Sequence, residues 1–131
     1  MTSHHRVLHT GPKLTIYAAI GPTGGCEAEA WLAALADRAK AQFLARFERL
    51  AEIGFLRSPE EMRELQCGSG EKVHEIKVPF GPGYRLYVIR VGRDWLATHG
   101  TTKPRDARVC TEATRARDIY RSYRERKAGG R

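Results

Sequence analysis

The sequence predicts an α+β fold in which an N-terminal helical hairpin packs on a twisted antiparallel sheet and a C-terminal helix follows. Two changes of period support this prediction. Apolar residues recur at helical spacing over residues 27–53, and they alternate with polar residues over 73–99. After Cys110 the pattern is helical again, with Ile119, Tyr120 and Tyr123 as its apolar contacts.

The N-terminal half supplies the first strand and the helical hairpin. Residues 1–12 are expected to form a flexible tail, so that one domain would span residues 13–127. A strand is predicted over 13–20 and is closed by the turn sequence G-P-T-G-G. Helices follow over 27–53, where Asp37 can cap the second helix of the hairpin.

A further short helix is expected at S-P-E-E, residues 58–61. Ser58 can cap such a helix, Pro59 suits its first position and Glu61 suits its third. The helix must be short, because the turn sequence C-G-S-G follows at residues 67–70.

Three strands are expected to form an antiparallel meander over 73–78, 84–91 and 95–99. Alternation places Glu75 and Lys77 on one face of the first strand, and Arg85, Tyr87 and Ile89 on one face of the second. In the third strand, it groups Trp95, Ala97 and His99 against Leu96 and Thr98. One face of the sheet is expected to pack on helices and the other to be more open.

Charge is distributed unevenly along the 131 residues, which carry a net charge of +8. Residues 1–71 contain 8 Lys and Arg against 9 Asp and Glu, whereas residues 72–131 contain 15 against 6. A one-sided basic surface favours a polyanionic partner such as RNA, because phosphate contacts supply most non-specific affinity. The alternative is a solvated surface with an arginine-rich terminal helix.

The hydrophobic, charged and cysteine content indicates a soluble globular protein. Hydrophobic residues make up 41% of the chain and charged residues 29%, which is typical of a soluble globular domain. Cys26, Cys67 and Cys110 form no C-x-x-C pair, so all three are expected to be reduced and the protein cytoplasmic. No membrane segment and no cofactor are expected. The tail histidines His4, His5 and His9 are a weak metal motif.

The more open face of the meander gathers residue types that suit RNA cleavage. Internal cleavage needs a base for the 2′-OH proton, a cation at the phosphate and an acid for the leaving 5′-oxygen. A carboxylate or imidazole can serve as the base, a histidine as the acid, and an arginine can bind two phosphate oxygens. The candidates for catalysis are Arg85, His99, Glu75 and Lys77, and those for RNA or phosphate binding are Lys103, Arg105 and Tyr87.

Each candidate also has a structural interpretation. Glu75 and Lys77 can pair with charged neighbours across the sheet. Tyr87 can pack in the core or stack on a base, and His99 can simply cap the end of its strand. His74, on the opposite alternation, is expected to be a core histidine with its hydrogen bonds satisfied.

The chain resembles the RelE/ParE toxin superfamily, and within it the HigB-like and phage-derived branch. The resemblance covers residues 14–124 and rests on four segments in order: F-L-A-R-F-E-R-L-A-E-I-G-F-L, V-H-E-I-K-V, G-Y-R-L-Y-V-I-R and L-A-T-H-G-T-T-K-P-R-D. It depends on the combination E-x-K, G-Y-R and H-G-x-x-K, since each piece alone is common.

The resemblance implies a toxin of a type II toxin–antitoxin system that cuts mRNA in the ribosomal A site without a metal. By this likeness, Arg85 contacts the scissile phosphate and His99 is the proposed acid. Glu75, Lys77 and Lys103 match other charged positions of the family. The implied partner is an antitoxin with a helix-turn-helix fold.

The sequence also departs from the family pattern, and two other functions stay open. Thr101 and Thr102 follow the H-G pair where relatives often have an aromatic or aliphatic residue and successive lysines. One alternative is a non-enzymatic toxin that poisons gyrase. The other is a phage-derived relative that binds nucleic acid or protein without nuclease activity.

Overall fold

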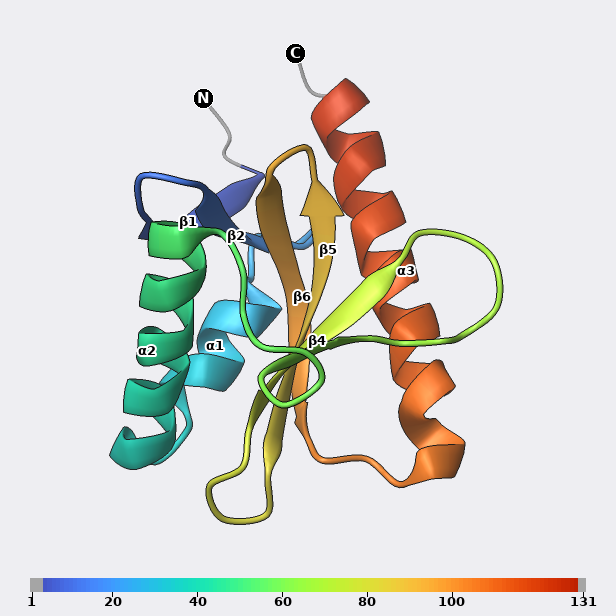
Figure 1. Cartoon of the computed structure of the whole chain (residues 1–131). Coiled ribbons are helices and arrows are strands. Elements are labelled where there is room, and N and C mark those ends of the chain that lie inside the picture. Colours follow the sequence, from blue (N-terminus) through green and yellow to red (C-terminus); the bar gives the residue numbers. More distant parts are fainter. Residues whose placement is uncertain (1–3, 130–131) are drawn as a thin grey trace.

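A six-stranded sheet lies between two helices on one side and one long helix on the other (Figure 1). The structure is a computed structural model, and it describes residues 4–129. The elements follow one another as β1 (His5–Thr10), β2 (Thr15–Ala19), α1 (Glu27–Ala33), α2 (Asp37–Ile53), β3 (Met62–Glu64), β4 (Val73–Val78), β5 (Tyr84–Val91), β6 (Asp94–Thr102) and α3 (Asp106–Gly129).

The topology corrects the predicted fold, although the chain is a mixed α+β protein. The expected N-terminal helical hairpin is wrong, because two strands come first and the helices α1 and α2 follow them in mid-chain. The strand order is β1-β2-β6-β5-β4-β3, and β2 runs parallel to β6, so the sheet is not wholly antiparallel. Parallel neighbours need a long crossover connection, which here contains α1, α2 and the strands β3 to β5.

Two local predictions are also wrong. Residues 5–10 form strand β1 and pair with β2, where a flexible tail was expected over residues 1–12; residues 1–3 lie outside the described part. The S-P-E-E segment forms turns before strand β3 instead of a helix. The Glu61 carboxylate there accepts a hydrogen bond from the backbone N–H of Arg57, four residues earlier, at 3.0 Å.

Each face of the sheet has its own apolar core. Helices α1 and α2 cover one face through Ala28, Phe43 and Phe47, which pack on side chains of β2, β4, β5 and β6. Helix α3 covers the other face through buried side chains such as Ala116 and Tyr120. The expectation of one more open face is therefore wrong: α3 lies along it, although its overall composition is strongly polar.

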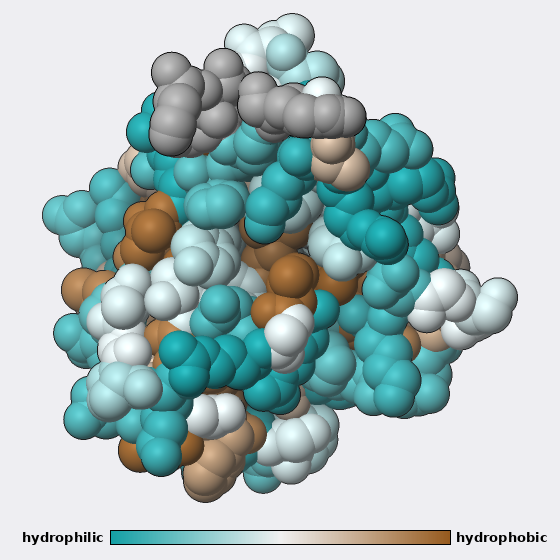
Figure 2. All heavy atoms as spheres, turned by 90° about the horizontal axis from the view of Figure 1, so that it is seen from above, coloured by the Kyte–Doolittle hydropathy of each residue, from teal (hydrophilic) through white to brown (hydrophobic). Residues whose placement is uncertain are grey.

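Polar side chains cover most of the surface at the end of the molecule where both chain ends lie (Figure 2). Apolar side chains lie there in separate patches among hydrophilic ones. This arrangement agrees with the two buried cores, which take up most of the large apolar residues.

Strand β6 contains a β-bulge that changes which face its side chains occupy. Tyr87 stands opposite His99 and Val88 stands opposite Ala97, so Thr98 is an extra residue. Trp95 and Ala97 belong to the core under α1 and α2, whereas His99 contacts α3. The predicted grouping of Trp95, Ala97 and His99 on one face is therefore wrong, because strict alternation stops at the extra residue.

Beyond the bulge, Gly100 faces helix α1 at a place where no side chain fits. A Cβ atom built on Gly100 would lie 2.2 Å from the ring of Trp31. The ring of Trp31 also packs edge-on against Phe43 and Tyr84, at 5.6 and 6.1 Å between centroids. The glycine thus lets α1 approach the sheet closely.

We predict that Gly100→Ala lowers the free energy of unfolding by about 3 kcal/mol, because the Trp31 ring must move from its packed position against the core. Urea denaturation followed by tryptophan fluorescence measures this change. Gly25→Ala is the matched control and should change stability little, since a Cβ there meets no atom within 4 Å. Equal stability of the two variants would contradict the close approach of Trp31 to the sheet.

Candidate nucleic-acid interface

The register of the sheet brings the predicted site residues together in two rows on the α3 side. Glu75, Tyr87 and His99 stand opposite one another on β4, β5 and β6. Lys77 and Arg85 form the next row together with Thr101. Because of the bulge, the Arg85 and His99 side chains lie on the same side of the sheet.

The row that contains Tyr87 and His99 is buried. Both side chains are fully shielded from solvent, and their rings stack at 4.6 Å between centroids and 19° between planes. The Tyr87 hydroxyl shares a hydrogen bond of 2.9 Å with Thr101. Burial raises the pKa of Tyr87 to about 12, and the Thr101 hydrogen bond only partly offsets this.

Helix α3 closes over His99 through a single acidic side chain. His99 Nε2 lies 2.9 Å from Glu112 Oε1, and Nδ1 lies 3.1 Å from the Thr98 hydroxyl. Burial lowers the pKa of His99 and outweighs the Glu112 hydrogen bond, which acts to raise it. The lowered pKa favours a neutral imidazole, and the fully buried ring lies under helix α3, out of reach of RNA.

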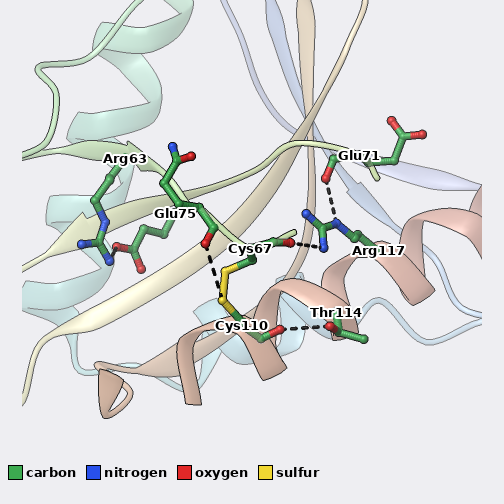
Figure 3. Close-up of a disulfide and its surroundings, with 8 residues drawn as sticks. Arg63, Cys67, Glu71, Glu75, Cys110, Thr114 and Arg117 are labelled. Atoms are coloured by element: carbon green, nitrogen blue, oxygen red, sulfur yellow. Dashed lines mark hydrogen bonds and ion pairs between the residues drawn. A yellow bond between two sulfur atoms is a disulfide. The ribbon is translucent and has the colours of Figure 1, made fainter. Parts of the chain in front are cut away.

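The Glu75 carboxylate lies between two guanidinium groups. Its exposed fraction is 1%, its Oε2 is 2.7 Å from Arg63 Nη2, and its Oε1 is 3.4 Å from Arg85 Nε. Figure 3 shows Arg63 extending toward Glu75. The contact between Arg63 and Glu75 is short enough for an ion pair, but its atoms are not aligned for a hydrogen bond. The attraction between the two groups is therefore mainly electrostatic. Glu75 is placed to hold Arg85 rather than to accept a substrate proton.

The second row opens on a hollow of about 270 Å³ beside the turn between β4 and β5. Lys77, Arg85 and Lys103 line it together with Glu60 and the turn residues. The Lys103 backbone N–H donates to the Gly83 carbonyl at 2.9 Å, which joins the strand end to the turn. Gly83 has a φ of +83°, a conformation that glycine adopts without strain.

Arg85 forms the floor of this hollow, and the two lysines lie at its sides. Arg85 is only 7% exposed, and its Nη1 donates to the Tyr84 carbonyl at 3.1 Å. Lys77 Nζ donates to the Pro59 carbonyl at 3.0 Å. Burial lowers the pKa of Lys77, and the nearby charges of Arg85 and Arg63 lower it further. The hollow therefore presents three basic side chains from three different segments, beside the Glu60 carboxylate.

Two features of the molecule lie away from this hollow. Arg105 is exposed in the connection between β6 and α3 and does not line it. A cavity of about 600 Å³ lies between the loop before α1 and helix α3. It contains none of the predicted site residues.

Sequence reasoning missed the groups that hold the site in place. Arg63, Thr98 and Glu112 all contact predicted site residues. Arg63 and Glu112 lie outside the alternating pattern of 73–99, and Thr98 was placed on the face opposite His99. Glu112 lies 13 residues from His99 on another element, so only the packing of α3 brings them together. His74 is also not satisfied as expected, because its buried Nδ1 has no hydrogen-bond partner.

The expectation of three reduced cysteines is wrong. Cys67 and Cys110 form a disulfide that joins the segment after β3 to the first turns of α3, with Cα atoms 5.3 Å apart (Figure 3). Cys26 is free and buried. A sequence separation of 43 residues gives no local signal for such a pair. Disulfides persist mainly in oxidising compartments, so this bond does not support a cytoplasmic location.

Comparisons with known proteins leave the resemblance as an expectation. No family model, no curated protein and no solved structure matches this chain. Within residues 4–129, no helix has the length and apolar character to cross a membrane. In the same described part, no three His, Cys, Asp or Glu side chains are grouped to hold a metal ion.

We predict that His99 makes the protein less stable as the pH falls below about 6.5, the unfolded pKa of histidine. Because its folded pKa is lowered, the unfolded state binds the proton first, and stability falls until the folded pKa is reached. The free energy of unfolding, measured with urea between pH 8 and 5, should depend less on pH in His99→Gln than in the parent protein. The difference in slope should be at most about 1.4 kcal/mol per pH unit.

The other histidines provide an internal control for this measurement. His5 and His74 also have lowered pKa values, but they are present in both proteins and cancel in the difference. An identical pH dependence in the parent protein and His99→Gln would contradict the buried, neutral imidazole.

Proposed function

We propose that this chain is the toxin of a type II toxin–antitoxin system and that it cleaves mRNA in the ribosomal A site, in the cytoplasm. The observation that supports the proposal most is the hollow formed by Lys77, Arg85 and Lys103, whose floor is an arginine held by the Glu75 carboxylate. Preorganised cations of this kind suit a phosphodiester whose negative charge increases during cleavage. The excess of positive charge in residues 72–131 favours the same partner.

The proposed reaction uses the open row instead of the buried one. The lowered pKa of Lys77 favours its neutral amine, which takes the proton from the 2′-OH, and the 2′-oxygen attacks the adjacent phosphorus. Arg85 binds the non-bridging oxygens of the phosphate. The Lys103 ammonium gives a proton to the departing 5′-oxygen. The bond from phosphorus to the 5′-oxygen breaks, which leaves a 2′,3′-cyclic phosphate and a 5′-hydroxyl.

This assignment changes the roles that the sequence suggested for two residues. His99 was the expected acid and Glu75 an expected base, but His99 is buried under α3 and Glu75 is paired with Arg63 and Arg85. We assign them to the support of the site. A helix-turn-helix antitoxin as the neutralising partner remains part of the proposal.

A second candidate is RNA binding without cleavage, as in a phage-derived relative that lacks nuclease activity. The burial of His99 and the pairing of Glu75 favour it, because these two groups were expected to move protons. This candidate needs the cations of the hollow but no proton transfer by Lys77.

We predict that Lys77→Met reduces RNA cleavage by about 10²-fold or more, because it removes the base but keeps the aliphatic stem of the side chain. The protein is induced in cells, new mRNA 5′ ends are mapped, and growth of the cells is measured. Arg93→Ala, an exposed change in the β5–β6 turn, is the control and should cleave normally.

The outcomes separate the two candidates. Undiminished cleavage by Lys77→Met would contradict the role of Lys77 as base. Salt-sensitive RNA binding by the parent protein, with no new 5′ ends, would favour binding without cleavage. Arg85→Ala is a less clean test, since it removes a partner of the buried Glu75 carboxylate and costs about 1–3 kcal/mol of stability.

A further inference from the structure

A second group of cations lies next to the hollow, around the carboxylate of Glu61. The Glu61 side chain is 2% exposed, and guanidinium nitrogens of Arg46, Arg49 and Arg57 lie 3.1, 2.6 and 3.5 Å from its oxygens. Arg46 and Arg49 come from helix α2, and Arg57 comes from the segment that follows it. Burial acts to raise the pKa of Glu61, but hydrogen bonds from Arg57 and the charges of Arg46 and Arg49 lower it overall.

The charges of this cluster do not cancel. Three guanidinium groups surround one carboxylate, so the cluster keeps two positive charges in excess. Arg49 is 43% and Arg57 68% exposed, and each touches Glu61 through one terminal nitrogen. Their other N–H groups are free to point outward, and a guanidinium fork suits a phosphate.

Stability alone does not require all three arginines. Arg46 is 17% exposed and also donates from Nε to the Lys77 carbonyl at 3.0 Å, which fits a structural role. Arg57 lies 3.5 Å from the carboxylate and is mostly in solvent, and such exposed pairs contribute little to stability. The cluster therefore contains more exposed guanidinium groups than are required to neutralise the buried Glu61 carboxylate.

The cluster is continuous with the hollow through one short segment. The Lys77 backbone N–H donates to the Glu61 carbonyl at 2.8 Å, and Lys77 Nζ donates to the Pro59 carbonyl at 3.0 Å. Glu60, which lies between Pro59 and Glu61 in the sequence, lines the hollow itself. Basic side chains thus continue from Lys103 and Arg85 through Lys77 to the arginines around Glu61, with the Glu60 carboxylate beside them.

We infer that Arg49 and Arg57 form a second phosphate site, in which each arginine binds one backbone phosphate of the same RNA strand beyond the phosphate held at Arg85. This inference rests on the proposed function, because it extends the RNA surface of the hollow. The ligand is a single-stranded ribose-phosphate chain, bound through its charge and without reading of its bases.

Two probes and one double variant test the second site. The probes are a 12-nucleotide 2′-O-methyl RNA, which cannot be cleaved, and a 2′-O-methyl dinucleoside monophosphate with a single phosphodiester. The double variant is Arg49→Ala with Arg57→Ala. We expect it to bind the long probe about tenfold more weakly, with a salt slope smaller by about 1.4, since each single-strand phosphate contact contributes about 0.7. Binding of the short probe should be unchanged.

The matched control removes the same charge elsewhere. Arg93→Ala with Arg121→Ala changes two exposed arginines, one in the β5–β6 turn and one on α3. This pair should leave the salt slope for the long probe near the parent value. Should the first double variant fail to fold, Arg57→Ala alone, at the most exposed position of the cluster, should lower the slope by about 0.7.

The result distinguishes the inference from the proposed function. Equal slopes and affinities in the two double variants, with the parent protein binding the long probe, would overturn the second site and leave the hollow intact. Failure of the parent protein to bind either probe would overturn both.

Discussion

One extra residue in β6 determines how the polar side chains of this sheet are divided between its faces. The bulge at Thr98 places His99 beside Tyr87 on the α3 face and turns Gly100 toward Trp31 on the other. Without it, His99 would follow Trp95 and Ala97 into the core under α1 and α2, where an imidazole has no carboxylate such as Glu112. The aligned rows of the candidate interface depend on this irregularity.

Helix α3 then buries one of the two rows and leaves part of the other open to solvent. It closes over Tyr87 and His99 and leaves Lys77, Arg85 and Lys103 around a hollow at the sheet end. That end, with the β4–β5 turn and the β6–α3 connection, lies opposite the chain ends in Figure 1. The buried row supports the second row. Glu75 forms an ion pair with Arg85, and Tyr87 shares a hydrogen bond with Thr101, the cross-strand neighbour of Arg85. Cations in fixed positions are the part of this site that solvent and a phosphate can reach.

The sequence allowed parts of this arrangement to be predicted, and its errors have physical causes. Alternation in β4 and β5 correctly put Glu75, Lys77, Arg85 and Tyr87 on one face, because those strands are regular. The bulge could not be foreseen, since it depends on cross-strand contacts of Thr98. The cover over His99 was missed because α3 packs through small residues such as Ala113 and Ala116, which carry little apolar signal. Strand β1 and the Cys67–Cys110 bond depend on partners distant in the sequence.

If the hollow binds RNA as proposed, a phosphate contacts Arg85 while His99 stays buried. Side-chain ¹⁵N NMR during titration with a short 2′-O-methyl RNA tests both points. We expect saturable shifts of the Arg85 Nε signal, with the His99 ring nitrogens unchanged and still neutral at pH 7. An unaffected Arg85 signal, or a His99 signal that shifts first and strongly, would contradict this mode of binding.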